Sequence, residues 1–177
     1  MGNLAVLILR AVLGLLLAGH GSQKLFGHFN GPGLEGTSGF LETLGMRPGR
    51  PWAYLAGLSE FGGGVLTVLG FLNPLGPLAV IGAMAMAWAT AHRGQPIWAT
   101  EGGAELPLTN IAAATAIMLN GPGKYSLDRA LGTRLPGWLV PLGLVAIALS
   151  VIYGVGGEAP PPEGEEAREE LAGEDDA

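Results

Sequence analysis

The stretch LAVLILRAVLGLLLAGHGSQKLF, residues 4–26, decides the fold class of this chain. It is apolar over about the twenty residues that a helix needs to cross a hydrocarbon core of ~30 Å. A cleaved signal peptide is the competing interpretation, but the basic N-terminal region and small-residue cleavage site of such a peptide are missing. We therefore expect residues 4–26 to be a retained transmembrane helix.

Four more apolar runs follow, and their length indicates helices. Only helices and closed barrels satisfy their backbone hydrogen bonds in lipid, and barrel strands are shorter and alternate between apolar and polar residues. The sequence therefore predicts an all-α polytopic membrane bundle, with a four-helix core and a fifth, C-terminal transmembrane helix. The four runs are residues 52–72, 75–91, 106–119 and 138–155.

The segments between the runs predict the domain boundaries. Gly and Pro clusters mark turns in the 27–51 connector, where residues 37–44 are expected to form a short helix on the membrane surface. Nine acidic residues fall between 158 and 177, a stretch rich in Glu, Pro and Gly that we expect to be disordered. The expected parts are a four-helix membrane domain at 1–131, an added helix at 132–157 and the acidic tail at 158–177.

The composition excludes several function classes. Only 14% of the residues are charged, against about 25% in a soluble domain. Without cysteine, the chain cannot hold disulfides, thiolate-ligated iron–sulfur clusters or covalent c-type haem. It also lacks a basic stripe interleaved with aromatic residues, so we do not expect nucleic-acid binding. No His and Glu stand four residues apart on one helix, so we expect no metal site.

Ionisable side chains at the ends of the apolar runs are the strongest functional signal, because charge is costly in hydrocarbon. When crossings are counted, the end of the first run, the start of the second, the end of the third and the start of the fourth fall at one membrane face. We expect the side chains there to share one polar pocket, with Asn110 slightly deeper. They are His20, Lys24, Glu60, His92 and Glu105.

Glu60 is the hardest of these residues to explain as ordinary structure. An unpaired carboxylate at that depth costs several kcal/mol, so we expect it to pair with Lys24 or His20, which share one helix face. There are simpler alternatives for the other residues. Lys24 could extend its ammonium group to the membrane interface, and His92 and Glu105 could be solvated residues at the ends of a loop. Arg10, near the opposite end of its helix, is expected to snorkel or to cap.

Six segments resemble DoxX-type membrane proteins, in order along residues 4–131. One such segment would be weak evidence, whereas six in sequence are specific. They are RAVLGLLLAGHGSQKLFG (10–27), GFLETLGM (39–46), GLSEFGGGVLTVLGF (57–71), MAMAWATAH (84–92), GGAELPL (102–108) and LNGPGKYSLDRAL (119–131).

The resemblance implies a four-helix membrane core and a link to quinone chemistry or oxidative-stress defence; one relative belongs to a thiosulfate:quinone oxidoreductase. The run at 138–155 and the acidic tail depart from the family pattern. The motif residues carried over are Arg10, His20, Gly21, Lys24, Glu60, Gly63, His92, Glu105, Gly121, Pro122, Ser126 and Asp128.

Residues and resemblance together predict a quinone-linked oxidoreductase component, spanning the cell's inner (cytoplasmic) membrane several times. A quinone needs hydrogen-bond donors at its carbonyl oxygens and a proton carrier nearby. Lys24 or His20 would donate, and Glu60 or Glu105 would relay the proton, which makes Glu60, His20 and Lys24 the candidate catalytic residues. No electron source is evident in the chain, so we expect a redox partner protein. The candidate quinone-binding residues are His92, Glu105 and Asn110.

Three alternatives remain open at this point. The polar cluster could be a structural network in a membrane scaffold or assembly factor. His20 and His92 could be the axial ligands of a b-type haem, because they are expected at similar height on different helices. A small-solute transporter is the third alternative, although no inverted repeat is visible. The basic residues after position 123 favour an N-terminus inside the cell, with the polar pocket facing outside.

Overall fold

The computed structural model describes residues 2–156, and every regular element among them is a helix. The all-α prediction is thereby confirmed, and the short helix expected at 37–44 is present but begins earlier. The predicted acidic tail lies outside the described residues. The elements are α1 (Asn3–Phe26), η1 (His28–Asn30), α2 (Gly33–Thr43), α3 (Gly49–Leu69), α4 (Leu75–Ala89), η2 (Ala99–Glu101), α5 (Glu105–Asn120), α6 (Leu127–Leu131) and α7 (Leu139–Val155).

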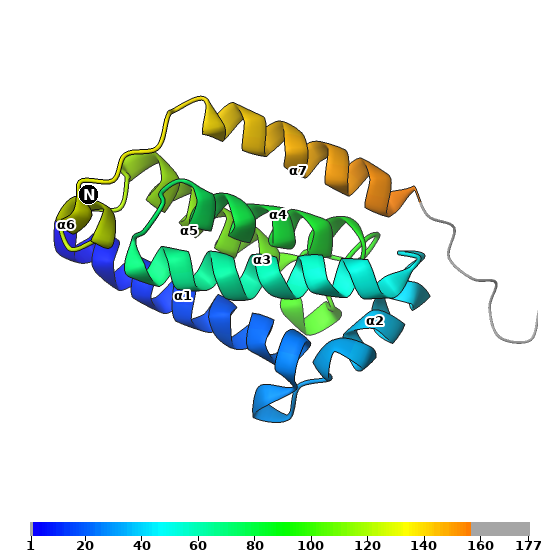
Figure 1. The fold of residues 1–177 in the computed structure, drawn as a ribbon. Helices are drawn as coiled ribbons and strands as arrows, with labels where there is room; N and C mark the ends of the chain where they lie inside the picture. Colours follow the sequence, from blue (N-terminus) through cyan, green and yellow to red (C-terminus); the bar gives the residue numbers. More distant parts are fainter. Residues whose placement is uncertain (1, 157–177) are drawn as a thin grey trace, which may run out of the picture.

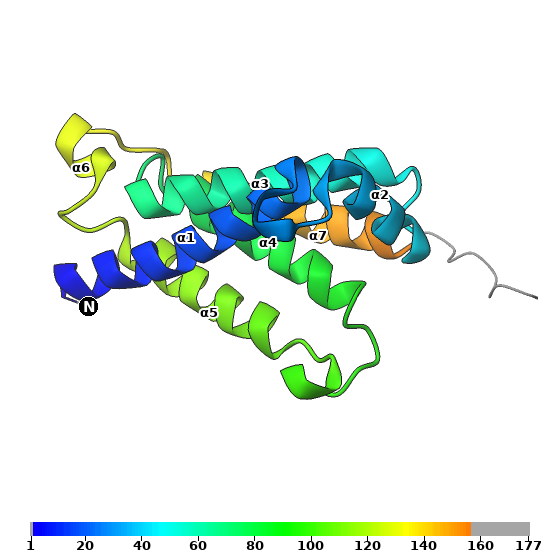
Figure 2. The same ribbon diagram turned by 90° about the horizontal axis from the view of Figure 1, so that it is seen from below.

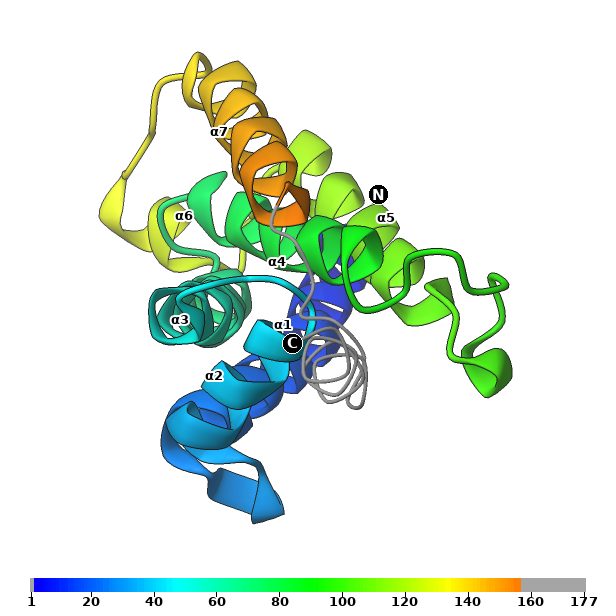
Figure 3. The same ribbon diagram turned by 90° about the vertical axis from the view of Figure 1, so that its right-hand side faces the viewer.

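The long helices lie lengthwise in one bundle, and the connectors gather at its two ends (Figure 1). One end, called here the α2 end, holds α2 with the last turn of α1, the first turn of α3 and the last turn of α7. The other, the α6 end, holds the N-terminus and α6 (Figure 1). In the view along the bundle, α7 lies over α4 (Figure 3). Successive long helices thus run from end to end, in the order that counted crossings predict.

The helices differ in how clearly they qualify as membrane spans. Among the described residues, α1 alone is long and apolar enough to cross a membrane by length and composition, whereas α4 and α7 are apolar but shorter. Large apolar side chains nevertheless cover the outside of the bundle; Leu16 is 60% exposed and Leu149 is 62% exposed. Exposed apolar surface on this scale favours contact with lipid. The helical bundle is established, and its crossing the membrane several times remains a prediction.

The main apolar core fills the space between α1, α4 and α5. Its side chains are nearly inaccessible, and they give the bundle the close packing that fixes the positions of its helices. They are Leu13, Leu17, Val80, Ile81, Met84, Ala114 and Ile117.

Glycines let α1 and α3 approach closely enough for their polar residues to meet. A Cβ atom added to Gly64 would stand 2.5 Å from the backbone nitrogen of Ala18, and one added to Gly14 would stand 2.6 Å from the carbonyl oxygen of Gly64. No side chain fits in that space. Small residues at such positions are what helix contacts in lipid favour, because they allow backbones to touch.

Arg10 caps rather than snorkels. It is 2% exposed, and its guanidinium donates to the carbonyl oxygens of Thr67 at 2.9 Å and Val68 at 2.6 Å, at the end of α3. It also donates to the carbonyl oxygens of Pro122 and, at 3.0 Å, Tyr125. A helix leaves its last carbonyls without partners. Arg10 supplies those partners and fastens the 122–125 connector to α1 and α3.

Candidate functional site

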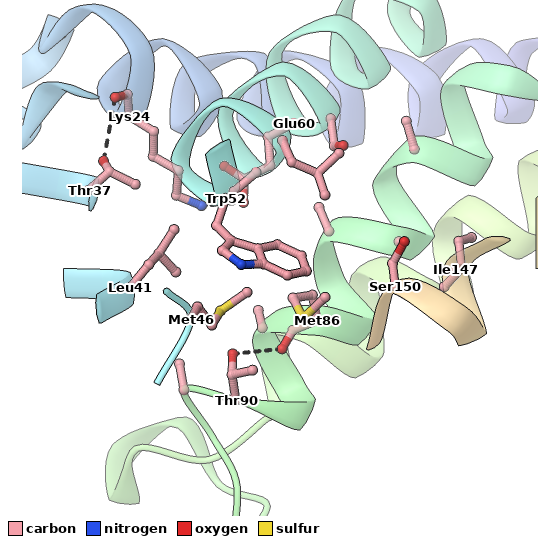
Figure 4. A pocket seen from close by; sticks show the side chains of 18 of the residues that line it. Lys24, Thr37, Leu41, Met46, Trp52, Glu60, Met86, Thr90, Ile147 and Ser150 are labelled. Carbon is pink, nitrogen blue, oxygen red and sulfur yellow. Dashed lines mark hydrogen bonds and ion pairs between the residues drawn. The ribbon is translucent and has the colours of Figure 1, made fainter. Parts of the chain in front are cut away.

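A cavity of about 240 Å³ lies between α3, α4 and α7 and is closed by α2 and the connector that follows it. Most of its lining is apolar, which suits a ligand that arrives from lipid. Figure 4 shows its larger side chains gathered around the ring of Trp52. The lining includes Lys24, Thr37, Leu41, Met46, Trp52, Ser59, Glu60, Ala83, Met86, Thr90, Ile147 and Ser150.

An ion pair between Lys24 of α1 and Glu60 of α3 forms the polar end of this cavity. Lys24 Nζ donates a hydrogen bond to Glu60 Oε1. The Glu60 side chain is 4% exposed, whereas that of Lys24 is 32% exposed. The sequence-based expectation that Glu60 pairs with Lys24 or His20 is therefore met by Lys24. The glycine contact between α1 and α3 brings the two side chains within reach.

The second oxygen of the same carboxylate has no partner. Glu60 Oε2 is buried and makes no hydrogen bond with any described residue. A buried polar atom left unsatisfied costs about 1–3 kcal/mol, and more when it is charged. Thr67 Oγ1 is also buried and unsatisfied, but it does not line the cavity. The unpartnered carboxylate oxygen thus gives the cavity a specific acceptor for a ligand's hydrogen-bond donor.

Hydroxyl groups around the cavity fall into two kinds. Those of Thr37 and Thr90 donate to backbone carbonyls of their own helices, at 2.7 Å to Gly33 and 2.8 Å to Met86. The hydroxyls of Ser59 on α3 and Ser150 on α7 make no hydrogen bond with any described residue. Side chains of this kind in apolar helices usually bond back to the preceding turn. Two free hydroxyls in one apolar cavity are therefore available to a ligand.

The remaining predicted residues lie elsewhere. His20 is exposed on α1 and does not line the cavity. His92 Nδ1 lies 2.6 Å from the carbonyl oxygen of Gly102, and Glu105 Oε2 accepts from the backbone N–H of Ala99 at 3.0 Å. Both contacts shape the loop between α4 and α5, and α5 with η2 diverges from α1 there (Figure 2). Of the ionisable residues expected in one pocket, only Lys24 and Glu60 share it.

Asn110, the deepest of the predicted binding residues, also stands outside the cavity. Its Nδ2 lies 3.5 Å from Met84 Sδ, so it bridges α5 and α4 within the bundle. Within residues 2–156 no group of three His, Asp or Glu side chains is placed to hold a metal ion. His20 and His92 are both absent from the cavity lining, so the geometry offers no support for haem ligation there.

Sequence reasoning missed the contributions of α2 and α7. The cavity is lined by Leu41 of α2 and by Ile147 and Ser150 of α7, yet none of them carries a charge that would single it out. One signal was present: Ser150 is the single serine in the α7 run, and a lone hydroxyl in a lipid-facing helix deserves an explanation. Which face of α7 packs inward could not be deduced, because its residues are apolar all round.

The class of protein follows from the sequence match to a family model. The DoxX family model matches residues 5–93, half of the chain. The chain belongs to the DoxX family, and the protein is a membrane protein. The resemblance is confirmed for the four segments that lie within residues 5–93. The matched region contains both Lys24 and Glu60, whereas α5, α6 and α7 lie beyond it. Searches of curated proteins and of solved structures found no match.

Proposed function

We propose that this protein is a quinone-linked oxidoreductase component of the cytoplasmic membrane, and that the cavity beside Lys24 and Glu60 receives the quinone headgroup. One observation carries the proposal. A mostly apolar cavity ends at a buried carboxylate whose second oxygen has no hydrogen-bond partner among the described residues. A site of this kind suits a flat, apolar ring with polar groups at its edge. In the quinol form those groups are hydroxyls, which can donate to the free oxygen of Glu60.

The residues of the cavity fit the two requirements of a quinone headgroup. The ring needs apolar walls, which Trp52, Met46 and Met86 supply. Its carbonyl oxygens need donors, and Lys24 has three N–H donors, of which Glu60 takes one. Ser150, on the opposite helix, adds a hydroxyl. A volume of about 240 Å³ holds a headgroup rather than a whole lipid quinone, so the isoprenoid chain would extend into the bilayer.

Glu60 would handle the proton in this proposal. Reduction of a quinone to its quinol takes up two electrons and two protons, and the electrons would come from a redox partner protein. A carboxylate held against an ammonium group can take a proton and pass it on without moving far. Glu60 lines the cavity, and its Oε2 has no hydrogen-bond partner among the described residues. Lys24 would orient the headgroup and balance the carboxylate charge.

A titration tests the proposal directly. The full chain in lipid nanodiscs would be titrated with a short-chain ubiquinone or menaquinone analogue, and tryptophan fluorescence followed, because Trp52 lines the cavity. We expect saturable quenching, with E60Q and K24M weakening binding about tenfold or more, since hydrogen bonds to charged groups contribute about 1.5–3 kcal/mol. The control is E35Q, which removes a carboxylate that is 84% exposed on α2. Equal binding by E60Q, K24M and wild type would overturn the proposal.

A scaffold or assembly role is the second candidate, and one observation favours it. The Lys24–Glu60 pair joins α1 to α3, the helices in closest contact, so it could serve only to fix their register. The two functions predict different results in a strain lacking the gene. If the protein is a scaffold, variants at Ser150 and Trp52 that still fold will restore function in this strain. If the cavity binds a quinone, the same variants will not restore it.

A further inference from the structure

A second hollow, independent of the proposed quinone site, lies at the α6 end of the bundle. Its volume is about 410 Å³, and it is lined by residues of the α3–α4 turn and of the connector around α6. Arg129 and Arg134 both line it, together with Asn73, Thr133 and one buried carboxylate, Asp128. The hollow is therefore rich in hydrogen-bond donors, whereas the cavity at the α2 end is mostly apolar.

Neither arginine in the hollow is used by the fold. Both residues are exposed, and their guanidinium groups form no ion pair or hydrogen bond within residues 2–156. The acid beside them is already committed: the two oxygens of Asp128 accept the backbone N–H groups of Leu72 and Asn73, each at 2.9 Å. The buried Arg10 lies close enough to Asp128 for electrostatic interaction. Two arginines thus face the hollow against one lining carboxylate, that of Asp128, and the balance of charge there is positive.

The charge around the hollow favours an anion. Among the described residues, the other carboxylates lie on α2, on α3 near the α2 end, or around η2 and the start of α5, all away from α6. Lys124 adds a third exposed cation on the same connector, where its Nζ lies 5.1 Å from the ring centroid of Tyr125. Guanidinium groups suit phosphate oxygens, because their planar fork can donate two parallel hydrogen bonds.

Exposed apolar side chains beside the hollow favour a phospholipid over a free phosphate ion as its ligand. Leu131 is 66% exposed and Trp138 is 61% exposed, and Leu127 and Tyr125 are also exposed on this connector. Tryptophan and tyrosine are typical of the level of lipid headgroups. A phospholipid brings the phosphate and the acyl chains together, whereas inorganic phosphate would leave these apolar side chains uncovered. Basic pockets at helix ends bind anionic headgroups in this way.

We propose that the hollow formed by Asn73, Thr133, Arg129 and Arg134 is a binding site for the phosphate headgroup of an anionic phospholipid. The lipid would hold the α6 connector at the membrane surface. The connector's own attachment to the bundle runs through Arg10 and Asp128, so the site does not depend on quinone binding at the other end.

Native mass spectrometry of the full chain in neutral detergent tests this site. We expect phosphatidylglycerol to be retained in preference to phosphatidylcholine, and R129Q/R134Q to weaken that retention roughly tenfold. The control is K124Q, which removes one positive charge from the same connector. Lys124 does not line the hollow. The K124Q variant should keep most of the preference. Unchanged thermal unfolding of R129Q/R134Q in lipid-free detergent would show that the variant is folded.

Three results would overturn the inference. Equal retention of the two lipids by the wild type would remove the site. A loss in K124Q as large as in R129Q/R134Q would mean diffuse surface charge instead of a built hollow. Displacement of phosphatidylglycerol by an equal concentration of inorganic phosphate would assign the hollow to a soluble anion and not to a lipid.

Discussion

Tyr153, near the end of α7, stacks on Trp52, near the start of α3, with ring centroids 5.8 Å apart and planes 29° apart. Trp52 is a wall of the cavity, so this contact joins the proposed site to a helix beyond the region that the family model matches. A Cβ atom on the neighbouring Gly154 would stand 2.9 Å from Met86 Cε, another wall residue. The C-terminal helix is thus a structural part of the cavity.

The buried ion pair predicts an unusual order of stabilities. K24M leaves the Glu60 carboxylate buried without a counter-charge. Removal of one partner of a fully buried pair costs about 3–5 kcal/mol, and because Lys24 is 32% exposed we expect about 2 kcal/mol. The double variant K24M/E60L should recover part of that loss, because no lone charge remains. Thermal unfolding in detergent measures the order, and a double variant less stable than K24M would contradict it.

The α1–α3 contact predicts opposite outcomes for two glycines on the same helix. G64A places a methyl group against the backbone of Ala18, and overpacking of this kind costs about 1–3 kcal/mol. G62A has nothing within 4 Å of the added Cβ, and alanine is a better helix former by up to about 1 kcal/mol. We expect G64A to lower the unfolding temperature and G62A to leave it unchanged or raise it. Equal effects of the two substitutions would refute the close approach of the helices.

The hydrogen bonds of Arg10 predict that lysine cannot replace it, because several buried carbonyl groups depend on its guanidinium. Its guanidinium reaches carbonyl groups at the end of α3 and in the 122–125 connector. A single ammonium group cannot donate in those directions at once, and buried carbonyls would lose their partners. R10K should therefore destabilise the protein by about 2–4 kcal/mol, whereas R93K, in the exposed α4–α5 loop, should be neutral. Unfolding temperatures of wild type, R10K and R93K in detergent test this prediction. An R10K variant as stable as the wild type would contradict it.

Ser150 predicts a selective effect on ligand binding. S150A removes a hydroxyl that has no partner among the described residues, so folding should not change. Binding of the quinone analogue should weaken about three- to tenfold, the size of one neutral hydrogen bond. L149A truncates a neighbouring side chain that is 62% exposed and should bind normally. The titration of the proposed function serves here too, and an S150A curve that overlays the wild type would exclude contact with the ligand.

The end-to-end path of the helices predicts where water-soluble reagents reach the chain. Glu35 on α2 and Lys124 before α6 are both exposed and lie at opposite ends of the bundle. Because the chain has no cysteine, E35C and K124C are clean single-label variants. In intact cells an impermeant maleimide should label only one of them. Labelling of both from outside would be incompatible with a bundle that spans the membrane.

The sequence predicted the helices and one essential contact because both follow from general physics. Apolar runs define helices in lipid, and counted crossings bring Lys24 and Glu60 to the same membrane face. Burial of a carboxylate then requires a partner, which Lys24 provides. The roles assigned to these residues in catalysis remain predictions.

The positions of His92 and Glu105 could not be deduced in the same way. Crossing order fixes which membrane face a helix end occupies, but not the direction in which a loop leaves the bundle. Here the loop folds on itself through Gly102 and Ala99, away from the cavity. The inward face of α7 was equally hidden, because a helix that is apolar all round carries no pattern for its orientation.

The unequal exposure of the two partners in the ion pair gives the site a direction. Glu60 is enclosed, while Lys24, its one ion-pair partner among the described residues, is partly exposed beside α2. The exposed part of the pair lies at the α2 end, so a polar ligand would reach the carboxylate past Lys24 from that end. Access to the proposed site would then be one-sided: the polar end of the cavity would communicate with one compartment and not with the other.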